Sequence, residues 1–243
     1  MNIRFSPVQV NNAVRAVATQ IATESCDVFW RGLSEEQLWA ELVGCILSSQ
    51  VRHEMCSAAH ERLTELSLLS LERNQRTQQL HQDIYGALAR PFVGTDNSFN
   101  FVGRYRFPKT KSKQIAEAAR SLYEKNSEGL LALLTHNPDA RSARRQLVLL
   151  CSGVGPKQAS LFLRNIKFTD DLAILDAHVV RYMEWLGLVC CASGTLSSMR
   201  TYEQGEHSFR CHAWDCGFTP GILDTAVWIV MRAISVEGTK WQS

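Results

Sequence analysis

A lysine and an aspartate that lie nineteen residues apart are the residues best suited to covalent chemistry in this chain. Lys157 directly follows a Gly-Val-Gly-Pro sequence, and Asp176 directly precedes a segment with an apolar pattern. A neutral lysine amine is a nucleophile, and an ionised carboxylate stabilises the positive charge that develops on an attacked carbon. A lysine amine beside a carboxylate can therefore attack an electron-poor carbon.

The residues before Lys157 predict a tight turn between two helices. Gly153 and Gly155 tolerate positive φ, and Pro156 suits the first turn of the second helix, where its missing N–H costs nothing. The start of a helix presents free N–H groups and a partial positive charge, which together favour a phosphate. These residues alone are equally consistent with a purely structural turn.

Lys157 and Asp176 each have a simpler interpretation as well. A lysine in the first turn of a helix can contact phosphate and do nothing else, although the field of the helix favours its neutral form. Aspartate is a preferred N-cap, and the sequence AHVVRYMEWLGL that follows Asp176 is typical of an amphipathic helix. The spacing alone favours simple capping.

The elements that must position these residues are predicted to be helices throughout, so the expected fold class is all-α. Ser34 and Gln37 form a capping box before an apolar run, and Asn137–Pro138 and Thr219–Pro220 predict two further helix starts. The segment from 86 to 107 is the least regular, and no persistent alternation typical of a strand is found in the chain.

Composition and charge restrict the function only broadly. The chain has 243 residues, enough for one large or two small domains, and a net charge of +2, which excludes a polycationic nucleic-acid coat. Five basic residues without an acid among them predict a phosphate-binding surface, with a solvated loop as the alternative: Arg104, Arg106, Lys109, Lys111 and Lys113.

The eight cysteines do not have the spacing of a metal site. The last four, which an iron–sulfur cluster would use, are unevenly spaced: Cys190, Cys191, Cys211 and Cys216. The first four lie in apolar patterns and are expected to be small core residues: Cys26, Cys45, Cys56 and Cys151. We therefore expect no metal and free thiols.

The N-terminus and the hydropathy pattern predict a protein of the cytoplasm. The start MNIRFSPVQV has no long apolar region of a signal peptide, and no apolar run reaches the length that spans a membrane. Free thiols fit a reducing compartment. If the source is prokaryotic, association with the nucleoid is expected.

Two stretches resemble the helix-hairpin-helix plus Gly-Pro-Asp superfamily of DNA glycosylases: LCSGVGPKQASLFLRN and LAILDAHVVRYM. More narrowly, the chain resembles the Ogg2-type 8-oxoguanine DNA glycosylase/AP lyases. Three further pieces support this: ELVGCILSSQ, YRFPKTKSKQI and, more loosely, LDTAVWIVMR. Together they span roughly residues 40 to 232.

The resemblance implies two helical lobes with a DNA cleft between them. The central lobe covers about 35–164 and ends in the helix-hairpin-helix, and the second lobe combines 1–34 with 165–243. Lys157 then comes from one lobe and Asp176 from the other. The partner is duplex DNA that carries a damaged base, the protein is expected to be a monomer, and no cofactor is required.

The resemblance also implies a role for individual residues. Lys157 is the Schiff-base nucleophile and Asp176 the catalytic carboxylate. Gln50 fills the space left by the rotated base, His178 contacts a phosphate, and Trp228 contacts the base. The glycine turn and the local charge, rather than the resemblance, predict the residues that hold the DNA backbone: Gly153, Gly155, Arg104, Lys109 and Lys111. For Gln50, an ordinary polar helix end is nearly as good an interpretation. For Trp228, a core tryptophan is an equally good one. For His178, a half-buried histidine on a helix face is the better one.

Two departures from the Ogg2 pattern leave the substrate open. Ala177 stands where those relatives often have a charged residue, and Lys240 is followed by three more residues, Trp241–Ser243, where those relatives tend to end. The expected activity is excision of 8-oxoguanine followed by β-elimination. The alternatives are the same lyase chemistry on another damaged or modified base, and a non-catalytic DNA-binding module. The base preferred opposite the lesion is not determined by the sequence.

Overall fold

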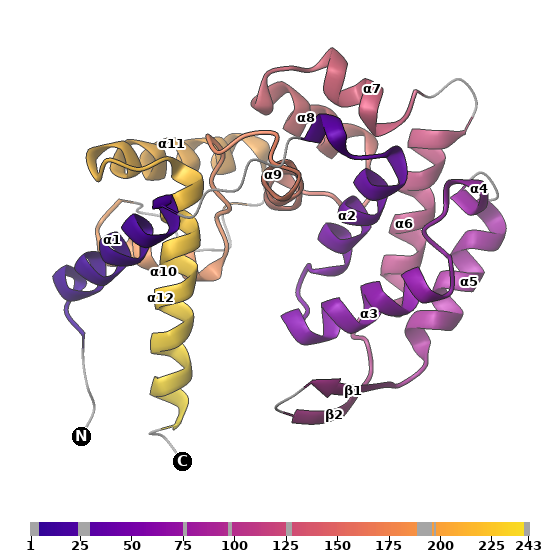
Figure 1. Ribbon diagram of the computed structural model, residues 1–243, viewed down its shortest axis with the longest axis horizontal. Helices are drawn as coiled ribbons and strands as arrows, with labels where there is room; N and C mark the ends of the chain where they lie inside the picture. The colour runs from indigo at the N-terminus through magenta and orange to yellow at the C-terminus, as the bar shows by residue number, and fades with distance from the viewer. Residues whose placement is uncertain are drawn as a thin grey trace. The chain divides into compact units, whose positions relative to one another are not determined.

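The helices of the computed structural model form two compact units, Phe29–Ile166 and Met1–Val28 with Lys167–Ser243 (Figure 1). The structure describes residues 5–23, 30–74, 77–96, 99–124, 128–188, 196 and 198–240. Within these residues every element is helical except one pair of strands, so the all-α fold class is confirmed with one addition.

The larger unit is built around one buried helix. Its helices are a 3-10 turn at Trp30–Gly32, α2 (Glu35–Leu47), α3 (His53–Glu65), α4 (Leu71–Asn74), α5 (Thr77–Ala89), α6 (Pro108–Tyr123), α7 (Gly129–His136), α8 (Ala140–Leu150) and α9 (Pro156–Asn165). The helix α2 packs against α3, α6, α7 and α9. Its residues Leu38, Leu42 and Ile46 are fully buried, as their helical spacing requires.

The capping box at the start of α2 is confirmed. The side chain of Ser34 accepts from the Gln37 N–H at 3.2 Å, and the Gln37 side chain accepts from the Ser34 N–H at 2.8 Å. The helix start predicted at Asn137 is wrong, because Asp139 is the N-cap of α8 and accepts from the Ser142 N–H at 2.8 Å. Asn137 instead ends α7, where its amide donates to the Leu133 carbonyl at 2.9 Å.

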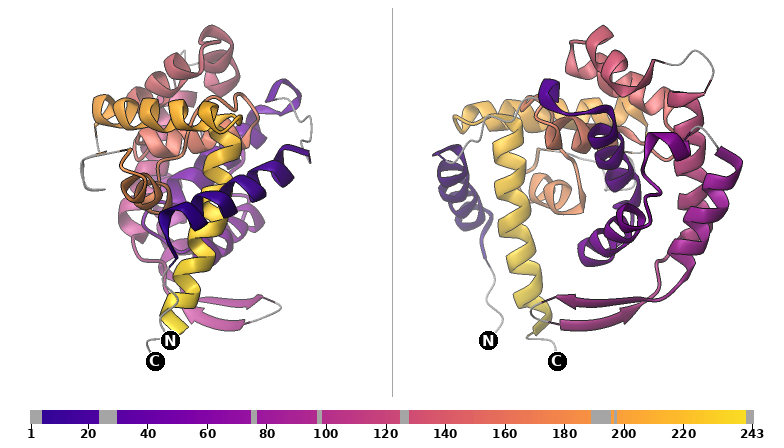
Figure 2. Two further views of the ribbon diagram at one scale, coloured as in Figure 1. Left: turned by 90° about the vertical axis from the view of Figure 1, so that its left-hand side faces the viewer. Right: turned by 45° about the vertical axis from the view of Figure 1, so that its right-hand side comes forward.

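The irregular segment between α5 and α6 contains a β-hairpin that the sequence did not predict. Strands β1 (Phe92–Asp96) and β2 (Phe99–Gly103) pair antiparallel and extend away from the helices of their unit (Figure 2). Arg62 of α3 holds the base of the hairpin. Its guanidinium donates to the carbonyls of Ala87, Arg90 and Pro91 at 2.9 to 3.1 Å, and lies 3.5 Å from the ring centroid of Phe92.

The smaller unit has a core formed by four helices: α1 (Pro7–Thr23), α10 (Ala177–Trp185), α11 (Met199–Asp215) and α12 (Pro220–Lys240). Helix α12 begins where Thr219–Pro220 predicted a start. The core includes Val10, Val14, Phe209 and Val227, each at most 2 % exposed. Burial of these side chains joins the N-terminal helix to the C-terminal helices.

No helix among the described residues is long and apolar enough to cross a membrane.

Candidate functional site

The predicted turn lies between α8 and α9 and depends on one glycine. Gly153 has φ +82°, and the Val154 N–H donates to the Cys151 carbonyl at 3.1 Å to close the turn. Gly155 does not use positive φ, contrary to expectation. It is the extended N-cap of α9, with φ −90° and ψ 179°, and Pro156 follows at the first helical position. The first-turn N–H groups of α9 therefore point out of the helix without a side-chain cap.

Helix α6 packs against this turn. A Cβ on Gly153 would lie 2.7 Å from the amide of Gln114, so glycine is required there for space as well as for φ. The hydroxyl of Ser152 donates to the Glu117 carboxylate at 2.7 Å. Because Gln114 and Glu117 belong to the same helix, the turn is fixed to α6.

Lys157 lies in the first turn of α9 with a half-buried side chain. Its amine makes no hydrogen bond or ion pair with any described residue. It interacts electrostatically with Cys45, a buried thiol of α2 whose pKa is raised well above its usual value by burial and, to a smaller extent, by Glu41, with Lys157 opposing the rise. Glu41 accepts from the Asn165 amide at 2.7 Å and so connects α2 to the end of α9. The surroundings of Lys157 thus leave its amine available.

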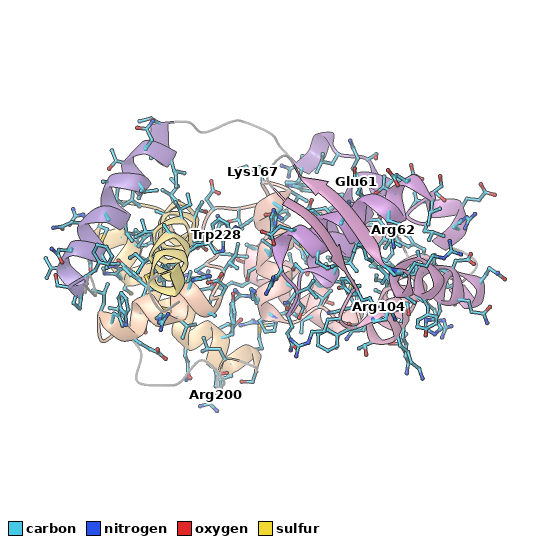
Figure 3. The ribbon with its side chains drawn as sticks, turned by 90° about the horizontal axis from the view of Figure 1, so that it is seen from below. Glu61, Arg62, Arg104, Lys167, Arg200 and Trp228 are labelled. Atoms are coloured by element: carbon cyan, nitrogen blue, oxygen red, sulfur yellow. The ribbon has the colours of Figure 1, made fainter. Side chains whose placement is uncertain are left out.

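Gln50 follows the end of α2 in an exposed turn and has the left-handed φ of 61°, which is uncommon for a residue with a Cβ. Tyr105 lies close to this turn, because its buried hydroxyl donates to the Leu47 carbonyl at 2.7 Å. The exposed residues Arg104, which Figure 3 labels, and Arg106 flank Tyr105 in the sequence. Arg104 and Arg106 therefore lie close to the turn that contains Gln50.

The basic cluster is not one uniform surface. Arg104 and Lys109 are exposed, as expected for residues that contact a DNA backbone. Lys111 differs, because its side chain is only 6 % exposed and its pKa is lowered by burial. The sequence shows only a run of alternating basic residues. It does not show which of them is buried, because successive residues of α6 point in different directions.

Asp176 is the N-cap of α10, as one of its two interpretations predicted. Its Oδ1 accepts from the N–H groups of His178 and Val179 at 2.8 and 2.9 Å. No hydrogen bond from a described residue reaches Oδ2. One oxygen of this half-buried carboxylate therefore caps α10, while the other is available for another interaction.

The segment before Asp176 has no regular secondary structure and is held by buried side chains that the sequence did not reveal. The N–H groups of Ala173, Ile174 and Leu175 donate to carboxyl and hydroxyl oxygens at 3.1, 2.5 and 3.1 Å. The acceptors come from α11 and α12 and are at most 3 % exposed: Tyr202, Glu206 and Asp224.

Tyr202 completes this arrangement by donating to the Ala173 carbonyl at 2.8 Å. The segment receives from side chains the hydrogen bonds that a strand would receive from a neighbour. One sequence signal was present, because Asp224 is the only charged residue in the mostly apolar run GILDTAVWIV.

The remaining candidates lie on the same unit as Asp176. His178 is half-buried in the first turn of α10. Trp228 lies on α12 (Figure 3) with 37 % of its surface exposed, and the Arg232 guanidinium lies 4.9 Å from its ring centroid. Trp228 is therefore not a fully buried core tryptophan. Lys157 belongs to the larger unit and Asp176 to the smaller, so the meeting of the two stays a prediction.

Some of the sequence predictions fall outside the described residues. These are the tail Trp241–Ser243 and three of the cysteines, Cys26, Cys190 and Cys191. Among the described residues, Cys45 and Cys151 are buried as expected and Cys56 is half-buried. No group of three or more His, Cys, Asp or Glu side chains there could hold a metal ion.

The chain matches the family model Ogg-HhH, described as 8-oxoguanine DNA glycosylase, over residues 96–217, which is half of its length. It is 31 % identical over 198 residues to the 8-oxoguanine DNA glycosylase/AP lyase of Metallosphaera sedula, covering 80 % of this chain and 82 % of the relative. The enzyme of the same name from Thermoplasma acidophilum is 29 % identical over 195 residues, with 80 % of each chain covered.

The fold is also similar to that of a solved 8-oxoguanine DNA glycosylase. The crystal structure of the 8-oxoguanine DNA glycosylase of Thermotoga maritima superposes with a TM-score of 0.63, at 26 % identity, and covers 91 % of this chain and 93 % of that one. The matched family model includes the whole helix-hairpin-helix and Asp176. The chain belongs to the Ogg-HhH family of 8-oxoguanine DNA glycosylases.

Proposed function

We propose that this protein is a bifunctional DNA glycosylase/AP lyase that excises 8-oxoguanine from duplex DNA. The observation that carries the proposal is Lys157 at the uncapped start of α9, with an amine that no described residue engages, in a chain of this family. The relatives named above are 8-oxoguanine DNA glycosylase/AP lyases, and their names describe both halves of the reaction.

The glycosylase step begins with removal of the damaged base from the helical stack, since its sugar cannot be reached there. Gln50, exposed in its turn after α2, occupies the vacated space. The neutral amine of Lys157 then attacks C1′ of the deoxyribose. The bond from C1′ to the base breaks, the base leaves with the electron pair, and opening of the sugar ring gives a Schiff base between Lys157 and C1′.

The lyase step follows from the Schiff base. The iminium acidifies the C2′ proton, and its loss breaks the C3′–O bond so that the 3′ phosphate leaves with the electron pair. Water then hydrolyses the Schiff base and regenerates the Lys157 amine. These steps require no metal and no organic cofactor.

Asp176 stabilises the positive charge that develops on the sugar. Its Oδ1 is engaged by the cap, so Oδ2 is the oxygen available for this role. The three buried side chains that hold residues 173–175 restrict where this carboxylate lies. Asp176 is therefore both the N-cap of α10 and the catalytic carboxylate in this proposal.

The other candidates hold the DNA. The N–H groups at the turn of Gly153 and Gly155 bind a backbone phosphate, as helix starts do. Arg104, Lys109 and His178 contact further phosphates. The exposed ring of Trp228 stacks on the extruded base.

A second candidate is the same chemistry on another damaged or modified base. It is favoured by Ala177, which is exposed on α10, and by the residues that follow Lys240. A non-catalytic DNA-binding module is disfavoured, because phosphate contact alone does not require the pair of Lys157 and Asp176.

Borohydride trapping with a set of lesion-bearing duplexes tests the proposal. Borohydride reduces the Schiff base to a stable amine, so a covalent protein–DNA complex reports Lys157 chemistry. We expect trapping and strand cleavage with 8-oxoguanine duplexes. If trapping prefers another base, the second candidate is supported. If the protein is not trapped even on a preformed abasic site, a non-catalytic DNA-binding module is the remaining interpretation.

A further inference from the structure

Two helices of the larger unit begin beside the Gln50 turn without a capping side chain. The N-caps of α3 and α6 are Arg52 and Phe107, and neither side chain hydrogen-bonds to the first turn. By contrast, α2, α8, α10 and α11 each begin at a serine or aspartate that caps them. The uncapped starts leave N–H groups and a partial positive charge that favour an anion. Helix α9, our candidate for phosphate binding, is uncapped in the same way.

Both helix starts are fixed to the end of α2. The hydrogen bond from Tyr105 to the Leu47 carbonyl holds the entry to α6, at 2.7 Å. The Cys56 thiol, in the first turn of α3, lies 3.6 Å from the Gly44 carbonyl. Because one helix end anchors the two starts, they lie together beside Gln50.

Lys111 in the first turn of α6 supplies a cation close to both helix starts. Its side chain is 6 % exposed and interacts electrostatically with Cys56 of α3. Within the described part of the chain, no carboxylate pairs with it.

Cys56 does not neutralise this charge. Burial raises the pKa of its thiol to about 11, so the thiol is uncharged at neutral pH. An ammonium that is partly withdrawn from water and has no countercharge costs folding free energy. An anion from outside the protein would remove this cost.

We propose that the starts of α3 and α6, with Lys111 between them, form a second phosphate-binding site for the DNA backbone beside Gln50. This site is separate from the turn before α9 and rests on the proposed function only in that its ligand is duplex DNA. Exposed Arg52 and Arg104 stand at its edge and suit the neighbouring phosphates of a continuous strand. A phosphate held here fixes the DNA backbone next to the point where Gln50 enters the duplex.

The Lys111→Met variant tests this site, because methionine fills a similar volume without the charge. We expect affinity for an undamaged duplex to fall about tenfold and the salt slope to fall by about 0.9. The melting temperature of the free protein should stay equal or rise, since an uncompensated charge is removed. The result specific to this proposal is therefore weaker DNA binding without a loss of protein stability.

Lys113→Met is the matched control. It removes the same charge from the same helix, but Lys113 is exposed and pairs with Glu117 at 3.7 Å. Its affinity should change less than twofold. Equal losses in both variants would mean that Lys111 acts only through net charge, and an unchanged affinity in Lys111→Met would remove the site. A clearly lower melting temperature in Lys111→Met would contradict the uncompensated charge.

Arg52→Asn keeps the proposal testable if Lys111→Met does not fold. Asparagine is a good N-cap, so it should stabilise α3 and occupy the N–H groups that the phosphate needs. We expect a higher melting temperature together with weaker binding, and unchanged binding would overturn the site.

Borohydride trapping of the wild-type protein on a preformed abasic site separates this proposal from the proposed function. Normal trapping with unaffected binding in Lys111→Met would remove only the phosphate site. If the wild type does not trap, the proposed function fails, and the phosphate site is still judged by binding to undamaged duplex.

Discussion

Lys157 and Asp176 are held in place by two different kinds of structure. The position of Lys157 follows mainly from local geometry, because Gly153 with its positive φ, the extended Gly155 and Pro156 are its immediate neighbours. Its turn has one side-chain hydrogen bond to α6, from Ser152 to Glu117. The segment before Asp176 is held by hydrogen bonds that its N–H groups donate to Tyr202, Glu206 and Asp224, which lie 27 to 50 residues away in the sequence.

This difference has a physical consequence. A turn that is defined by its own residues forms whenever its two helices form. A segment held by distant buried side chains is positioned only when the whole core of the unit is folded. We therefore expect the nucleophile to tolerate distant substitutions better than the carboxylate does.

Lys157→Gln should have the largest effect, because it removes the nucleophile itself. We expect cleavage to fall by about 1,000-fold or more, with duplex binding largely retained. Strand cleavage and filter binding, measured on one preparation, give both values. Wild-type trapping by this variant would mean that another amine does the chemistry.

Asp176→Asn should separate the charge of this residue from its capping role. Asparagine caps a helix about as well as aspartate, so the free energy of unfolding should change by less than about 0.5 kcal/mol. Single-turnover excision should slow by about 100-fold, since the charge that stabilises the sugar cation is lost. A variant that unfolds readily but excises normally under permissive conditions would leave Asp176 with the capping role alone.

Tyr202→Phe should show how the distant side chains act on Asp176. The change leaves the Leu175 N–H and the Ala173 carbonyl without a buried partner, which costs about 1 to 3 kcal/mol. Urea unfolding measures the loss of stability. Excision should slow as well. Without denaturant, borohydride should still trap Tyr202→Phe and the wild type through the same lysine. Unchanged stability would mean that residues 173–175 are held by other contacts.

Gly153→Ala and Gly155→Ala form the finest comparison, within the turn itself. Alanine at Gly153 must adopt φ +82° and meets Gln114, so we expect a loss of about 1 to 2 kcal/mol. Alanine at Gly155 keeps an ordinary extended conformation and should cost less than about 1 kcal/mol. Thermal unfolding of the two variants side by side measures the difference. Equal losses would show that the turn does not depend on positive φ at Gly153.

The sequence predicted the parts of the fold that local signals determine. The capping box at Ser34, the helix start at Pro220 and the N-cap at Asp176 follow from residues that lie within a turn of each other. The start of α8 was misplaced by two residues, because Asn137 and Asp139 are both good caps; in the structure Asn137 ends α7 and Asp139 caps α8.

The sequence could not predict features that depend on distant contacts. Lys111 is buried where α6 packs against α2, close to Cys56 of α3, and a run of basic residues gave no sign of this. The hairpin at 92–103 depends partly on Arg62, whose contacts with the residues before β1 span 25 to 29 positions. The buried acceptors Glu206 and Asp224 were missed for the same reason.

Mapping the borohydride-trapped adduct by mass spectrometry tests the central claim most directly. The wild-type protein is reduced on a duplex that contains 8-oxoguanine, digested, and searched for the peptide that carries the sugar remnant. We predict that the modified residue is Lys157, in the peptide that begins at Gln146 or later and includes the turn before α9. An adduct on any other amine, or no adduct on a duplex that the protein binds, would contradict the assignment of Lys157 as the nucleophile.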